Sequence, residues 1–156
     1  MPIIEDMPIK KKENDRAKIV TDSNNENYVR SSISTEPILY EHLRRLMNDI
    51  SNYWADYKLS RLSHTLDDLY TLIKPRLKNK EDVIKDLDDK RDKAQKALTY
   101  NEADVEKQKG NSYHDRFMRL KQKMYAKAKP LLLDLQAALY EQLYELKLIL
   151  GGNKNE

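Results

Sequence analysis

Apolar residues recur at steps of three and four from residue 34 onward, which is the spacing of one buried face of an α-helix. The stretch 34–73 carries two such stripes. They are Leu39, Leu43, Leu46, Ile50, Tyr53 and Tyr57, followed by Leu59, Leu62, Leu66, Leu69 and Ile73. At 100° per residue the two stripes face nearly opposite directions. The helix therefore either breaks near residues 58–63, or stays straight and buries each half against a different neighbour, which implies a partner chain.

The boundaries of this first helix carry their own signals. Ser34 to Pro37 combines a hydroxyl cap, an acid in the first turn and an early proline, so the helix is predicted to begin there. The connector from Lys74 to Lys80 should end it, because Pro75 cannot continue a helix interior. Asn79 is the expected cap of the next helix.

The stretch 80–109 is highly charged, with acids and bases paired at i, i+4 around a narrow apolar seam. Such a seam supports one packing contact, as in a helical hairpin or coiled coil. The residues from Thr99 to Glu102 resemble a capping box, so a break is allowed there.

A third helix is predicted from Ser112 to Leu150, with Ser112 and Asp115 in capping-box spacing. The apolar stripe keeps its phase across Pro130, which favours a kinked but continuous helix. The glycines at 151 and 152 should stop it. Its C-terminal half carries a wide packing or interface face, called here the leucine face: Leu132, Leu135, Leu139, Leu143, Leu146 and Leu150.

The expected fold is all-α, an elongated, coiled-coil-like bundle of three long helices over 34–150, in which a helical hairpin packs against the first helix. Residues 1–33 are polar and are predicted to be a disordered arm, and residues 151–156 a tail. The alternative for the start of the arm is a short linear motif around Ile4 and Ile9 that docks on a partner.

Composition limits the cellular compartment and the kinds of chemistry that we expect of this chain. The chain has no cysteine, an acidic start unlike an export signal and no unbroken apolar span, so a soluble, cytoplasmic protein without a membrane partner is expected. His42, His64 and His114 lack the spacing of metal ligands, and no glycine loop could hold phosphate. We therefore expect no enzyme, metal, cofactor or small-molecule substrate.

Local positive charge is the clearest binding signal, although 29 basic and 26 acidic residues leave a net charge of only +3. One group, called here the basic ridge, lies within about 80° on the third helix. It consists of Arg116, Arg119, Lys123 and Lys127. The connector cluster adds Lys74, Arg76, Lys78 and Lys80. These residues would attract nucleic-acid phosphate, unless acids of the stretch 80–109 neutralise the ridge.

Aromatic residues suggest a second kind of contact. Tyr53, Trp54 and Tyr57 cluster on the first helix, where half-buried rings suit either a helix contact or an interface. A helix as long as the third also exceeds what a small domain can cover. The leading hypothesis is thus a non-enzymatic assembly or adaptor protein that binds a protein partner. The first candidate for that partner is another copy of the same chain, which would make a homo-oligomer. The alternative is a nucleic-acid-binding accessory protein.

Overall fold

The computed structural model describes residues 1–6, 18–19 and 36–150. Its α-helices within these ranges are α2 (Glu36–Ala55), α3 (Leu59–Ile73), α4 (Glu81–Ala97), α5 (Glu102–Glu106) and α6 (Tyr113–Glu145). A 3₁₀ turn, η2 (Lys74–Leu77), joins α3 to α4, and the two-residue strands β1 (Lys18–Ile19) and β2 (Ile149–Leu150) pair in antiparallel orientation. The all-α class is confirmed, but the described ranges hold five helices where three were predicted.

Several predictions fall on residues that the structure does not describe. Most of the predicted arm, the capping residues 34 and 35 and the tail at 151–156 lie outside the described ranges. Within those ranges, no helix has both the length and the apolar content needed to cross a membrane.

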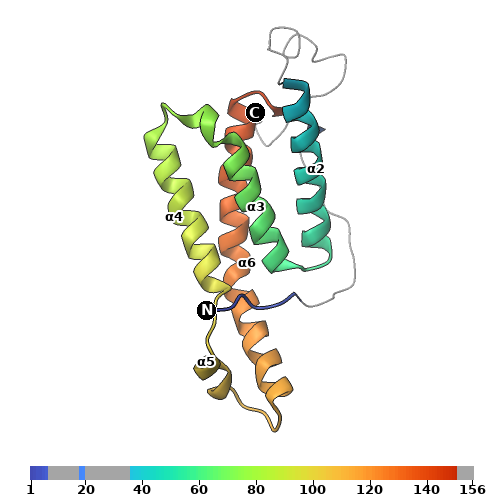
Figure 1. Cartoon of the computed structure of the whole chain (residues 1–156), viewed down its shortest axis with the longest axis vertical. Helices are drawn as coiled ribbons and strands as arrows, with labels where there is room; N and C mark the ends of the chain where they lie inside the picture. Colours follow the sequence, from blue (N-terminus) through green and yellow to red (C-terminus); the bar gives the residue numbers. More distant parts are fainter. Residues whose placement is uncertain (7–17, 20–35, 151–156) are drawn as a thin grey trace.

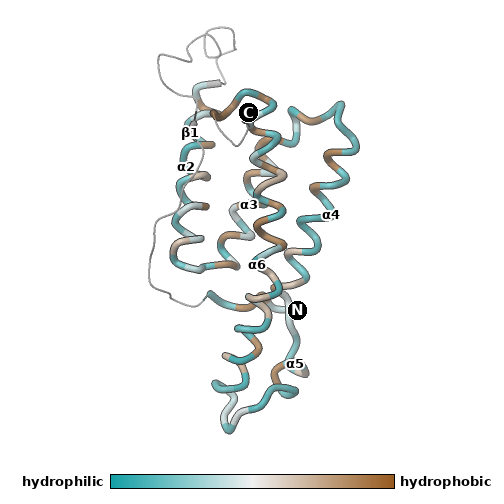
Figure 2. Tube along the Cα trace, turned by 180° about the vertical axis from the view of Figure 1, so that it is seen from behind, coloured by the Kyte–Doolittle hydropathy of each residue, from teal (hydrophilic) through white to brown (hydrophobic). Residues whose placement is uncertain are grey.

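The C-terminal half of α6 forms the centre of a helical bundle. α4 and α3 pack directly against it, and α2 packs against α3. The N-terminal half of α6 extends beyond this bundle together with α5 (Figure 1). We call α5 and residues 113–124 of α6 the projection. Hydrophobic positions recur at helical spacing along α6 and its neighbours (Figure 2), so the core follows α6 from the bundle toward the projection.

The break between α2 and α3 lies at residues 56–58, slightly before the predicted place. Tyr57 adopts a left-handed conformation with φ 57°, and the N–H of Lys58 donates to the carbonyl of Tyr53 over 2.8 Å. This is the closing bond of a helix C-cap that reverses the chain. Both apolar stripes therefore face one core instead of a partner chain. Their buried members include Leu39, Leu43, Ile50, Leu62, Leu66 and Leu69.

The predicted helix over 80–109 is divided into α4 and α5. The side chain of Asn101 accepts from the N–H of Asp104, and the carboxylate of Asp104 accepts from the N–H of Asn101, both at 3.0 Å. This reciprocal capping box starts α5. The break that the sequence allowed is present, but its capping box is formed by Asn101 and Asp104 and not by Thr99 and Glu102. The predicted cap at Asn79 was wrong, because Lys80 occupies the N-cap of α4 without a side-chain hydrogen bond.

The long helix α6 begins as predicted and ends earlier. The N–H of Asp115 donates to Oγ of Ser112 over 3.1 Å, and the helix passes through Pro130 without interruption. It stops at Glu145, five residues before the predicted end. There Lys147 takes a left-handed conformation with φ 61°, and the following N–H, of Leu148, donates to the carbonyl of Leu143 over 2.9 Å.

Residues 1–6 differ most from the predicted arm. Ile4 is fully buried and its N–H donates to the carbonyl of Leu98 over 2.9 Å. The carboxylate of Asp6 accepts from the N–H and the hydroxyl of Ser60, both at 2.7 Å, in the first turn of α3. Since α3 has no capping side chain at its own N-cap, Asp6 supplies the missing cap. We call the place where residues 1–6 cross, between the bundle and the projection, the waist.

Replacing Asp6 by alanine should lower the free energy of unfolding by about 1–2 kcal/mol, because the first turn of α3 loses its only side-chain acceptor among the described residues. Urea denaturation followed by circular dichroism measures this. Glu5→Ala is the matched control: its side chain is exposed, and we expect a change of less than about 0.5 kcal/mol. Equal stabilities of the two variants would show that residues 1–6 do not hold α3.

Candidate nucleic-acid interface

The projection is a rigid two-element structure. Val105 of α5 is fully buried, and Tyr100 packs edge-on against Phe117 of α6 with ring centroids 5.7 Å apart. Tyr113 stacks on the same phenylalanine at 6.1 Å and donates from its hydroxyl to Glu102 over 3.1 Å. These contacts fix one face of α6, so the opposite faces of the projection remain on the surface.

The basic ridge follows the edge of this packed face. Arg119, Lys123 and Lys127 are exposed, and none of them forms an ion pair with any residue that the structure describes. Arg116 is half-buried and donates to the carbonyl of Gly110 over 3.2 Å, so it also helps to hold the turn before α6. Three charges of the predicted ridge are therefore presented to solvent in a row, about 6 Å apart along the helix.

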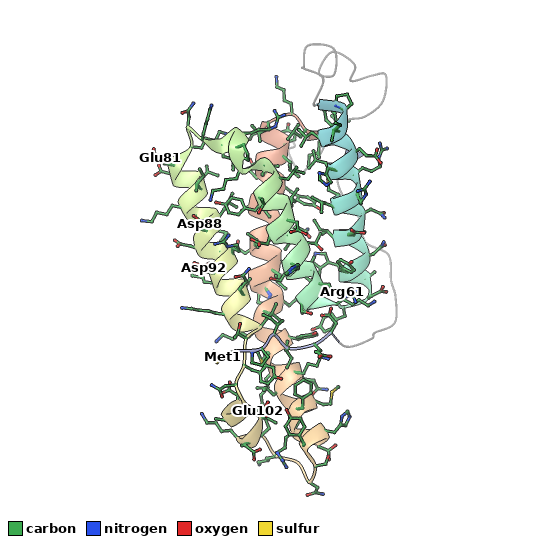
Figure 3. All side chains as sticks on the ribbon, in the orientation of Figure 1. Met1, Arg61, Glu81, Asp88, Asp92 and Glu102 are labelled. Carbon is green, nitrogen blue, oxygen red and sulfur yellow. The ribbon has the colours of Figure 1, made fainter. Side chains whose placement is uncertain are left out.

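Of the acids that were expected to neutralise the ridge, those of α4 lie along the bundle, and those of α5 form no ion pair with the ridge among the described residues. Glu81, Asp88 and Asp92 follow α4 along the bundle, whereas Glu102 is on α5 (Figure 3). The acid–base contacts of α4 are made within itself and with α3 and the C-terminal half of α6. They are Lys90 with Asp86 at 2.6 Å, Lys90 with Asp134 at 3.7 Å and Arg91 with Asp67 at 3.4 Å. Because α4 lies beside the other half of α6, these pairs leave the ridge uncompensated.

The connector cluster is at the opposite end of the bundle from the projection (Figure 1). Lys80 pairs with Glu145 at 3.5 Å and donates to the side chain of Gln142 over 3.2 Å. Lys74 lies over the ring of Tyr70, 5.4 Å from its centroid, and Arg76 and Lys78 are exposed. The structure thus separates the two basic groups, and part of the connector cluster is engaged within the bundle.

The residues predicted for helix packing or an interface are mostly used inside the chain. Leu132, Leu135, Leu139 and Leu143 are buried, Leu146 is half-buried and Leu150 is 46% exposed. Tyr53, Trp54 and Tyr57 are half-buried against the core. The indole N–H of Trp54 donates to Gln136 of α6, and Tyr57 packs edge-on against Tyr125 with centroids 5.4 Å apart. The leucine face and the aromatic cluster therefore stabilise this chain's own core.

The waist contains a buried tyrosine and a buried lysine that the sequence pattern did not indicate as candidate site residues. Tyr125 donates to the carbonyl of Glu5 at 2.8 Å and to Asp6 at 3.0 Å. Lys121 is only 4% exposed and lies 5.9 Å from the ring centroids of both Phe117 and Tyr125. Burial lowers the pKa of Lys121, although the nearby charges of Asp6 and Glu5 oppose this shift. Lys121 is thus a buried cation near the acids of residues 1–6, and the hydrogen bonds of Tyr125 join α6 to that segment.

A second polar network joins α3 to α4. The hydroxyl of buried Tyr70 donates to Asp88 over 2.8 Å, and Arg91 lies over its ring at 5.9 Å from the centroid. Burial raises the pKa of Tyr70 to about 12, and the hydrogen bond to Asp88 and the charge of Asp88 act in the same direction. Tyr70, Asp88 and Arg91 each have a partner within the bundle, which is typical of a structural network, although Nε of Arg91 is buried without a hydrogen bond among the described residues.

Comparisons of the chain with protein-family models, with curated proteins and with solved structures found no match. Function is therefore argued from geometry and charge.

Tyr70 predicts a measurable dependence of stability on pH. Its pKa is about 12 in the folded state and near 10 when unfolded, so its contribution is fully present below about pH 10 and is lost as the pH rises through about 12. The free energy of unfolding should fall more steeply between about pH 10 and 12 for the wild type than for Tyr70→Phe. The other titrating groups are common to both proteins and cancel in this comparison.

Asp88→Asn is a second variant for the same measurement, because it removes the charge that helps to keep the proton on Tyr70. Its slope should lie between those of the wild type and Tyr70→Phe. Identical slopes for all three proteins would contradict the assignment.

Proposed function

We propose that this chain is a non-enzymatic binding protein that holds nucleic acid along the basic ridge of α6. The observation that carries the proposal is the row formed by Arg119, Lys123 and Lys127 on α6, which are exposed and form no ion pair with the described residues. Phosphate is the partner that such a row attracts, because each contact releases a condensed counterion. The successive charges, about 6 Å apart, are far enough from one another for each to meet a different phosphate of one strand, whose charges follow the duplex axis at about 3.4 Å each.

The distribution of charge along α6 supports this proposal. Residues 113–129 contain six lysines and arginines and one acid, whereas residues 130–145 contain three acids and no lysine or arginine. The helix dipole favours acids near the start of a helix and bases near its end, which is the reverse order. Helix stability therefore does not account for the basic half. Attraction of an anionic partner accounts for the basic half of α6.

Assembly through the leucine face, the leading hypothesis from sequence, has lost its main argument because that face is largely buried within the bundle. A second candidate function is self-association through other surfaces. It is favoured by Ile38 on α2 and Leu133 on α6, which are 69% and 46% exposed. Light scattering over a wide concentration range tests it: a rise in mass with concentration would support it, and a strict monomer would exclude it.

The direct test of nucleic-acid binding is charge reversal. The variant R119E/K123E/K127E should bind a fluorescent duplex much more weakly than the wild type at low salt. If the row contacts three phosphates, wild-type affinity should fall about 40-fold between 50 and 200 mM salt, and this variant should lose most of that dependence. Fluorescence anisotropy titrations at the two salt concentrations measure both effects.

The matched control is K74E/K78E/K85E, which makes the same change in net charge at the opposite end of the bundle. It should retain wild-type affinity and salt dependence, and circular dichroism should show equal helicity for all three proteins. If the control loses as much affinity as the ridge variant, binding depends on overall charge rather than on the ridge. Absence of wild-type binding to both a duplex and a single strand at 50 mM salt would refute the proposal.

A further inference from the structure

The tip of the projection holds a surface groove of about 550 Å³. Its walls come from the turn before α6 and from the first three turns of that helix. The residues that could bind a ligand there are Asn111, His114, Asp115, Met118, Arg119 and Gln122. The turn packs closely on α6, because a Cβ at Gly110 would lie 2.8 Å from the Cβ of Asp115. Arg116 joins the two by donating to the carbonyl of Gly110.

The groove borders the basic ridge directly. Arg119 belongs to both, and Gln122 lies about 60° around the helix from Arg119, on the side away from Lys123. α5 covers a different face, through Phe117 and Tyr113. A strand whose phosphates follow the ridge would thus have the groove beside it, within reach of its bases.

The side chains of the groove suit a nucleobase. Asn111 and Gln122 each offer a donor and an acceptor, and His114 can provide either. Within the described residues none of these three side chains forms a hydrogen bond in the chain, and all three are exposed. Met118 is half-buried and supplies a polarisable apolar surface for the face of a ring. The negative charge of Asp115 disfavours phosphate inside the groove but can accept from an amino group of a base.

We propose that this groove accepts one unpaired nucleobase while the adjacent phosphates lie on the basic ridge, so that the chain prefers single-stranded over duplex nucleic acid. This proposal rests on the proposed function. In a duplex the bases are paired and stacked, and an isolated helical tip cannot reach their faces. In a single strand a base can turn out of the backbone and enter the groove.

The test compares N111A/Q122A with N48A/N52A in binding to single-stranded and duplex oligonucleotides of equal length, as DNA and as RNA. All four substituted side chains are exposed, and the control removes two amides from α2. N111A/Q122A should bind single strands about 10-fold more weakly, as expected for the loss of two hydrogen bonds, with unchanged duplex affinity. The control should match the wild type on every oligonucleotide.

The failures of the two proposals are distinguishable. If ridge charge reversal abolishes binding but N111A/Q122A leaves single-strand affinity unchanged, the proposed base binding in the groove is wrong. Nucleic-acid binding along the ridge is then still supported. Equal losses of N111A/Q122A on single strands and duplexes would also overturn the groove proposal. If the wild type binds neither kind of oligonucleotide at 50 mM salt, both proposals fail.

Discussion

A helix of 33 residues spans about 50 Å, whereas helices of 15 and 17 residues span only about 23–26 Å. α3 and α4 can therefore cover α6 along about half of its length. The C-terminal half of α6 has the larger apolar surface to bury, because the leucine face lies there. The bundle therefore forms around that half. The other half must stand outside the bundle, and the arrangement of the remaining elements follows from this mismatch.

The exposed half needs support, and two short segments provide it. α5 packs on its apolar face through Val105 and Phe117, and residues 1–6 close the waist through Ile4 and Asp6. What remains uncovered is polar, as solvent requires, and six of the seven charged residues at 113–129 are basic. Solvation alone does not require such an excess of one sign. Packing on one side and excess positive charge on the other are the features of this half of α6 on which the proposed function rests.

Local signals predicted the parts of the fold that depend on neighbours in sequence. The cap at Ser112, the passage through Pro130 and the grouping of the ridge on one face follow from helical geometry over a few turns. The left-handed Tyr57 could not be predicted, since tyrosine carries no signature for that conformation. Nor could the cap of α3 by Asp6, which lies 54 positions away.

The candidate site was predictable to a similar extent. Helical periodicity placed Arg119, Lys123 and Lys127 together, whereas nothing in the pattern indicated that α4 would lie beside the other half of α6 and leave them unpaired. The groove residues Asn111 and Gln122 carried no signal, because exposed amides are common on any helix. The break at Asn101 determines which helix lies beside the ridge. It turns the chain so that α5, and not α4, packs against this half of α6.

The closure of the waist also bears on the order of folding. Asp6 contacts residues 54 and 119 positions later in the chain, so forming these contacts early would require closing very long loops. The contacts of α2 with α3 are far more local and can form first. Residues 1–6 are synthesised before every element they touch, yet their contacts with both α3 and α6 need these two helices to be close together. Until then the described residues offer α3 no side-chain cap, so the waist closes only after the helices around it have met.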